Sequence, residues 1–173
     1  DLEQFAITRD EHKTHIKPFP ISIAFATEAG PDGEKEPDRN VLEHLGVHTT
    51  LVGLGVDRLD YTKGILERFK GIEHFLLTRP EYKERFTFLQ IAPPSREDAE
   101  KYREYSETVS AEAERVNASV GTRNWKPIEL HKKHHPHSTL NKLYRLANVC
   151  LVTSLHDGMN LVAKEFVAAS DDH

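Results

Sequence analysis

The sequence predicts an α/β protein built on an open sheet of parallel strands. Three observations support this. Short apolar runs alternate with helical patterns from residue 50 onward. The runs lack the polar alternation of half-exposed strands, which is typical of strands buried on both faces. Each run leads through polar residues into a helix, and such connections between parallel strands are right-handed crossovers.

Length and composition fit one globular domain of 173 residues, 38% hydrophobic and 29% charged. A net charge of -5 argues against a nucleic-acid or anionic-membrane surface. The single cysteine, Cys150, lies in an apolar run and indicates no oxidising compartment, so we expect a cytoplasmic protein. No segment resembles a bilayer span or a signal peptide. Because the chain starts at Asp1 and stops soon after a predicted helix, we expect a piece of a longer protein.

The N-terminal residues 1–17 carry no clear pattern. Apolar residues then alternate from Phe19 to Phe25, which predicts a short edge strand entered through prolines. Residues 28–39 are rich in glycine, proline and charge, which is typical of a linker. We therefore expect a boundary near residue 40, followed by a short helix over 41–45.

The first strong strand is predicted over 50–56, and a polar loop, 57–64, leads from it into an amphipathic helix. Arg58 and Lys63 lie on this loop. Two cations beside a glycine near a helix start suit a diphosphate, which needs fixed positive charge and accessible backbone N–H groups. Solvated ion pairs with the two aspartates of the loop explain the pattern equally well.

The next strand is predicted over 85–92 and ends at two prolines. A long helix should follow from Ser95, as N-cap, to about residue 118. Arg96 falls in its first turn, where a cation opposes the helix dipole, so an anionic partner would explain it. Residues 121–127 are predicted as a loop whose Trp125 packs on the edge of the core.

A short strand is predicted over 127–130, and four histidines follow it: His131, His134, His135 and His137. Such a cluster suggests a metal site. No cysteine accompanies it, Pro136 disrupts a helical face, and the spacing fits no standard site. A helical face leads into the last strand and consists of Leu140, Leu143, Tyr144 and Ala147.

The last strand is predicted over 149–152 as buried on both faces. Asp157 and Gly158 form a turn in which the glycine supplies backbone freedom, and a helix begins near Leu161. Residues 157–160 then lie at the carboxyl end of a strand, beside free N–H groups of a helix start. Glu165, about two turns along, could face the same crevice. An ordinary connection with solvated polar residues is the alternative.

Three polar loops therefore share one position in the predicted fold: 57–64, 93–97 and 155–160. Each follows a strand and precedes a helix. In a parallel sheet such loops meet at one rim, where open α/β folds bind ligands.

Three segments, VDRLDYTKG (56–64), QIAPPSR (90–96) and SLHDGMNLVAKEF (154–166), closely resemble the trehalose-6-phosphate synthases. These are retaining glycosyltransferases with two facing Rossmann-like domains, and the similarity extends from about residue 19 to 169. It implies a Rossmann-like parallel sheet that forms part of the C-terminal domain of a GT-B enzyme. Residues 1–40 would end the N-terminal domain and form the linker, and 41–173 would form the first half of the nucleotide-sugar-binding domain.

The resemblance implies transfer of glucose from UDP-glucose to glucose 6-phosphate. Its site residues divide by the part of the substrates that they bind: Arg58 and Lys63 with the amides of Leu161 and Val162 for the diphosphate; Glu165 for the ribose; Asp157 with the backbone of Gly158, Met159 and Asn160 for the glucosyl hydroxyls; the segment from His135 to Leu140 for the uracil; Arg96 for the acceptor phosphate. Because cations on this loop do what a divalent metal does elsewhere, we expect no metal cofactor. No paired acids are needed for retention, since the leaving phosphate can take the acceptor's proton.

Several alternatives remain. His156 stands where many members carry arginine, which leaves the acceptor open, and enzymes that make glucosylglycerol phosphate share the donor motifs. A non-catalytic regulatory member and a metal phosphohydrolase using His156 and Asp157 are the other readings. The piece alone should bind UDP weakly at best and transfer no sugar, and the full-length protein could form a homo-oligomer.

Overall fold

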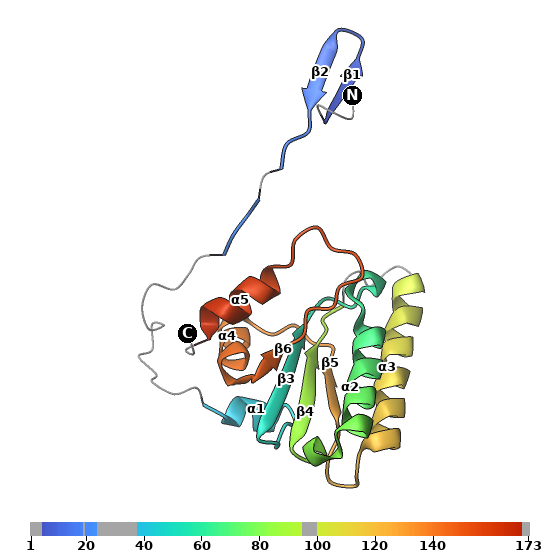
Figure 1. Cartoon of the computed structure of the whole chain (residues 1–173), viewed down its shortest axis with the longest axis vertical. Coiled ribbons are helices and arrows are strands. Elements are labelled where there is room, and N and C mark those ends of the chain that lie inside the picture. Colours follow the sequence, from blue (N-terminus) through green and yellow to red (C-terminus); the bar gives the residue numbers. More distant parts are fainter. Residues whose placement is uncertain (1–4, 19, 24–37, 95–99, 171–173) are drawn as a thin grey trace.

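The computed structural model describes residues 5–18, 20–23, 38–94 and 100–170 (Figure 1). It contains a two-stranded antiparallel hairpin and a four-stranded parallel sheet in the order β5-β4-β3-β6. Helices flank the parallel sheet. The predicted fold class, α/β with parallel strands, is therefore confirmed.

The hairpin was not predicted from the sequence. It pairs β1 (Ala6–Arg9) with β2 (His12–His15), and it lies apart from the larger sheet in Figure 1. Among its strand residues only Ala6 is buried, so neither strand carries an apolar alternation that would reveal it.

The strand predicted over 19–25 is wrong where it can be judged, because residues 20–23 form no strand. The remaining residues of that stretch, 19, 24 and 25, lie outside the described part, as does most of the predicted linker. An apolar alternation needs a partner strand to form a ladder, and proline supplies no N–H for one. The short helix predicted after the linker is confirmed as α1 (Asn40–His44).

The parallel sheet is centred on β3 (Leu51–Val56), which pairs with β4 (Phe86–Ile91) along its whole length. On the far side of β4 lies β5 (Ile128–His131), and β6 (Val149–Cys150) pairs with the other edge of β3. Each successive connection crosses over through a helix. All carboxyl ends of the strands therefore point to one rim of the sheet.

The last strand differs from its prediction. Only two residues of the apolar run 149–152 form β6, which pairs with β3 alone, and Val149 is 40% exposed. The Leu151 amide still donates to the carbonyl of Leu54 at 2.9 Å. Burial on both faces was the wrong expectation for this run, because Val149 is exposed and residues 150–152 are only half-buried. An apolar run alone does not reveal whether a further strand pairs beside it.

Helices cover both faces of the sheet (Figure 1). On one face α2 (Ile65–Thr78) and α3 (Glu100–Val120) bury a core that includes Phe69, Phe88 and Val116. The opposite face is covered by α1, α4 (His137–Leu146) and α5 (Leu161–Ala169), around a core that includes Leu54, Leu143 and Tyr144. The two cores hold the sheet in a three-layer arrangement.

Details of the predicted elements agree with this arrangement. Trp125 is buried, and its Nε1–H donates to the carbonyl of Phe86 at 3.0 Å. The long helix predicted to about residue 118 is confirmed as α3, whereas its predicted start at Ser95 lies outside the described residues. Within the described part of the chain, no helix is long and apolar enough to cross a membrane.

Candidate functional site

A cleft of about 420 Å³ opens at the rim where the parallel strands end. Most of the residues predicted from the sequence to form a site line it: Arg58, Lys63, His135, Leu140, Asp157, Met159, Asn160, Leu161, Val162 and Glu165. Gly158 lies in the same loop without lining the cleft, and Arg96 is outside the described residues. Segments that are distant along the chain therefore enclose one space.

The loop after β3 is shaped by its own side chains. Asp60 caps a short 3₁₀ helix, η1 (Tyr61–Lys63), by accepting hydrogen bonds from the amide and the hydroxyl of Thr62, at 2.9 and 2.8 Å. Gly64 ends this turn with φ +64°, a left-handed conformation that glycine adopts without strain. The capped turn fixes the direction from which Lys63 enters the cleft.

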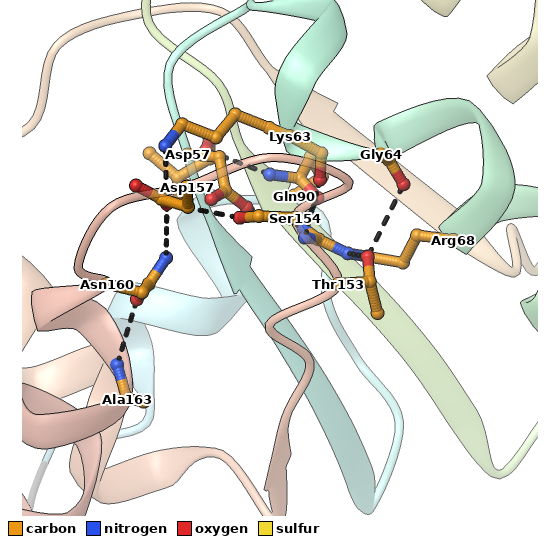
Figure 2. A network of polar contacts seen from close by, with 11 residues as sticks. Asp57, Lys63, Gly64, Arg68, Gln90, Thr153, Ser154, Asp157, Asn160 and Ala163 are labelled. Atoms are coloured by element: carbon orange, nitrogen blue, oxygen red, sulfur yellow. Dashed lines mark hydrogen bonds and ion pairs between the residues drawn. The ribbon is translucent and has the colours of Figure 1, made fainter. Parts of the chain in front are cut away.

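Lys63 joins the first loop to the last one. Its Nζ lies 2.6 Å from Oδ2 of Asp157, and the two side chains are 14% and 21% exposed. Ser154 Oγ and Asn160 Nδ2 also donate to this oxygen, at 3.2 and 3.4 Å (Figure 2). The hydrogen bond from Lys63 lowers the pKa of Asp157 below its ordinary value. Asp157 is therefore an ionised acceptor near neutral pH.

This pairing bears on the ion pairs that the sequence allowed within the loop. Lys63 does not pair with the neighbouring Asp60, whose carboxylate is used as the cap, but reaches across the rim to Asp157. The local ion pairs considered from the sequence are thus wrong for Lys63.

The start of α5 forms another wall of the cleft. Asn160 is its N-cap, with Oδ1 accepting from the amide of Ala163 at 3.2 Å. The first N–H groups of a helix have no partner within it and carry partial positive charge, so the amides of Leu161 and Val162 can serve an anion. Gly158 has no positive φ and open space around its Cα, so the predicted need for glycine at this turn is wrong.

Glu165 faces the cleft as predicted, although it is the fifth residue of α5 and lies nearer the helix start than expected. The buried hydroxyl of Tyr144 donates to its Oε2 at 2.9 Å, and His137 Nε2 lies 3.8 Å from its Oε1. Burial, and then the contact with Glu165, raises the pKa of Tyr144, so the phenol remains a donor at any working pH. The sequence had assigned Tyr144 only to the apolar face of α4.

The histidine-rich loop contributes His135 at the edge of the cleft. Its Nε2 is buried and has no hydrogen-bond partner among the described residues. Burial and the neighbouring His131 and His134 lower the pKa of His135, which keeps the ring neutral at pH 7. His131 has a different hydrogen-bond partner, because its Nε2 lies 3.0 Å from the carbonyl oxygen of Leu45. Among the described residues, no group of three or more His, Cys, Asp or Glu side chains could hold a metal ion.

Beneath the cleft lies a buried ion pair that the sequence analysis missed. Arg68 Nη1 donates to Asp57 Oδ2 and to Gln90 Oε1, both at 2.7 Å (Figure 2). The sequence did contain a signal that Arg68 is buried, because position 68 falls on the same stripe of α2 as Ile65 and Ile72.

Comparisons with known proteins show the family and the fold that this chain shares. The family model of glycosyltransferase family 20 matches residues 3–173. A bifunctional trehalose-6-phosphate synthase/phosphatase of Thermoproteus tenax is 37% identical over 99% of this chain. The structure of a UDP-forming α,α-trehalose-phosphate synthase from Burkholderia xenovorans in complex with glucose-6-phosphate matches with a TM-score of 0.83 and 36% identity over 96% of the chain. An E. coli structure bound with UDP-2-fluoro glucose matches with a TM-score of 0.82 and 32% identity over 98%.

The chain spans only part of each of these proteins: 24% of the Thermoproteus protein, 36% of the Burkholderia chain and 39% of the E. coli chain. The match of the family model nevertheless covers nearly its whole length, and the parallel sheet with flanking helices is shared with the solved structures. The chain therefore belongs to glycosyltransferase family 20.

Proposed function

We propose that the full-length protein transfers glucose from UDP-glucose to glucose 6-phosphate and forms trehalose 6-phosphate with retention of configuration. One observation carries the proposal: two cations, a helix start and three carboxylates from segments distant along the chain line one cleft of about 420 Å³. This volume is within the range of pockets that bind small molecules. Family membership supplies the reaction class.

The cationic wall would bind the diphosphate. Breaking the bond between glucose and UDP develops negative charge on the leaving phosphate, and fixed cations stabilise that charge most in the transition state. Arg58 and Lys63 supply the cations, and the amides of Leu161 and Val162 supply neutral donors. An ammonium group has three N–H donors, so Lys63 can keep Asp157 and still contact phosphate oxygens.

The remaining walls would bind the sugar and the nucleoside. Asp157, held ionised, accepts from glucosyl hydroxyls beside the backbone of residues 158–160. Glu165 accepts from the ribose hydroxyls through the capacity that Tyr144 leaves unused, since a carboxylate has about four lone-pair sites. His135 and Leu140 flank the base.

The acceptor side is proposed from the family resemblance alone. Arg96 would bind the phosphate of glucose 6-phosphate, and the leaving phosphate would take the proton of the attacking hydroxyl on the same face of the sugar. Such a step requires neither a pair of catalytic acids nor a metal ion. A related acceptor, as in glucosylglycerol-phosphate synthesis, is the second candidate, because His156 replaces the arginine of many members.

The remaining parts of the proposal concern the whole protein. Residues 1–40 would end the N-terminal domain and form the linker, and residues 41–173 would begin the donor-binding domain. A cytoplasmic location is supported by the single cysteine of the sequence, since proteins of oxidising compartments are typically richer in disulfides.

The test is an assay of the full-length enzyme with a panel of nucleotide sugars and phosphorylated acceptors, with and without EDTA. We expect trehalose 6-phosphate from UDP-glucose and glucose 6-phosphate, at a rate that EDTA does not change. Arg58→Ala should lower turnover by roughly two orders of magnitude, as for the loss of a preorganised charge contact. The matched control is Arg79→Ala, which removes an exposed arginine at the opposite end of α2. Near-normal turnover in Arg58→Ala would exclude Arg58 from the mechanism.

A further inference from the structure

Arg68 is the most connected buried side chain below the cleft. It projects from α2 with 0% of its side chain exposed and forms an ion pair with Asp57, whose side chain is 4% exposed. Its Nε donates to the hydroxyl of Thr153 at 3.0 Å, and Nη2 donates to the carbonyl of Lys63 at 3.4 Å. With Gln90 of β4, these four partners come from three separate segments of the chain (Figure 2).

The chain makes room for this guanidinium. A Cβ at Gly55, in β3, would overlap Gln90 Oε1 and Arg68 Nη1, so the strand leaves open the space that the network fills. Burial raises the pKa of Asp57, and the Arg68 charge opposes that shift. Removing two charges from water costs about as much as their attraction returns, so a buried ion pair contributes little net stability. What it does supply is a fixed geometry among its partners.

Three of these partners belong to the loops that form the cleft. Asp57 and Lys63 lie near the two ends of the first loop, and Thr153 lies in the segment between β6 and α5. The loops also touch through their backbones: the amides of Leu155 and His156 donate to the carbonyl of Thr62, at 2.8 and 3.2 Å. Gly64 approaches Thr153 so closely that a Cβ there would overlap its carbonyl oxygen. Arg68 bonds to both sides of this junction.

We propose that Arg68 is a positioning residue that holds the Lys63 loop against the Asp157 loop and so sets the spacing of the groups that bind the nucleotide sugar. Arg68 touches no substrate itself. It acts through the Lys63 carbonyl and the Thr153 hydroxyl, on which the placement of the Lys63 ammonium and the Asp157 carboxylate depends. The inference rests on the proposed function, since it assigns those two groups to the donor.

The experiment uses the full-length enzyme with three variants. Arg68→Lys keeps a charge opposite Asp57 but loses the planar fork that joins several acceptors at once. Thr153→Val keeps the ion pair and removes only the hydroxyl. Arg115→Lys is the matched control, because Arg115 also bridges carboxylates, those of Glu73 and Glu112, but on the outer surface of α2 and α3. Folded fraction, UDP affinity by calorimetry, and both Michaelis constants are measured for each.

We expect Arg68→Lys to lower kcat/KM for UDP-glucose by about 10-fold to 100-fold and to weaken UDP binding, as for a small misplacement of binding groups. Thr153→Val should have the same effect in smaller degree. KM for glucose 6-phosphate should stay within about two-fold, and Arg115→Lys should match the wild type. A purely structural role would instead reduce the folded fraction and leave KM for UDP-glucose unchanged, which would overturn the proposal.

Two further outcomes distinguish a failure of the inference about Arg68 from a failure of the proposed function. If Arg68→Lys does not fold, unchanged UDP affinity in folded Thr153→Val overturns the inference. If the wild type binds UDP but forms no trehalose 6-phosphate, the proposed function fails, and the UDP affinities of the variants still decide the role of Arg68.

Discussion

Replacing Tyr144 with phenylalanine tests whether the carboxylate of Glu165 is held in place for the donor. The phenol is buried, and its oxygen lies 2.9 Å from Oε2 of Glu165. Phenylalanine keeps the ring, which packs edge-to-face against Phe166 at 6.5 Å between centroids. The substitution therefore removes one hydrogen bond and little else.

The size of the effect follows from the exposure of the acceptor. A hydrogen bond to a charged group contributes about 1.5–3 kcal/mol, but a group that water can reach recovers part of it. The side chain of Glu165 is 23% exposed, so water can replace the phenol in part. We therefore expect a loss of about 1 kcal/mol in the free energy of unfolding. A similar loss in donor binding corresponds to a rise of about five-fold in KM for UDP-glucose.

The assay compares both Michaelis constants and urea denaturation for the full-length wild type and Tyr144→Phe. Because the raised pKa of Tyr144 keeps the phenol protonated, the ratio of KM values should not change between pH 6 and 9. The control is Tyr82→Phe, a half-buried tyrosine beside Phe75 near the amino end of β4, away from the cleft. An unchanged KM for UDP-glucose in Tyr144→Phe would refute a role for the phenol in orienting Glu165.

Two other perturbations address the junction of the loops. Gly64→Ala places a side chain at φ +64° against the carbonyl of Thr153, so we expect a loss of about 2–4 kcal/mol in the free energy of unfolding, measured by urea denaturation; Gly71→Ala, in α2 with open space around it, should not destabilise. For Asp157, the lowered pKa means that its pairing contributes above the unfolded-state value of about 3.9 and is lost as pH falls through the folded value. Carboxyl NMR titration should find its midpoint below about 3.9 in the wild type and higher in Lys63→Met; equal midpoints would contradict the pairing.

The rim of the sheet was the part of the site that sequence reasoning could predict. A strand followed by a polar loop and a helix leaves a local pattern, and parallel strands bring such loops to one edge. For this reason Arg58, Lys63 and Asp157 could be expected together, although they are distant along the chain. Their individual roles came from resemblance to a family, since the pattern alone allowed ordinary ion pairs.

Most of the missed features depend on contacts between elements that leave no local pattern. Tyr144 and Glu165 meet because α4 and α5 pack side by side, and either residue alone fits a helix face. For Arg68 the stripe of α2 did give a local signal of burial, but its partners become apparent only where β3 leaves space for it at Gly55. The exposed edge of β6 and the N-terminal hairpin were not predicted, because pairing partners, rather than composition, decide whether a run of residues becomes a strand.

The two ion pairs at the rim differ in a way that suits the binding of a charged donor. The pair of Arg68 with Asp57 is buried, so breaking it would leave an uncompensated charge and cost several kcal/mol, about 3–5. The pair of Lys63 with Asp157 is partly exposed, where such contacts contribute about 0–1 kcal/mol. A diphosphate can therefore bind the Lys63 ammonium at little cost in free energy, while the buried pair keeps the arrangement of both loops fixed. Because charges act mainly within a Debye length of about 8–10 Å, the local cations can attract an anion despite the net charge of -5.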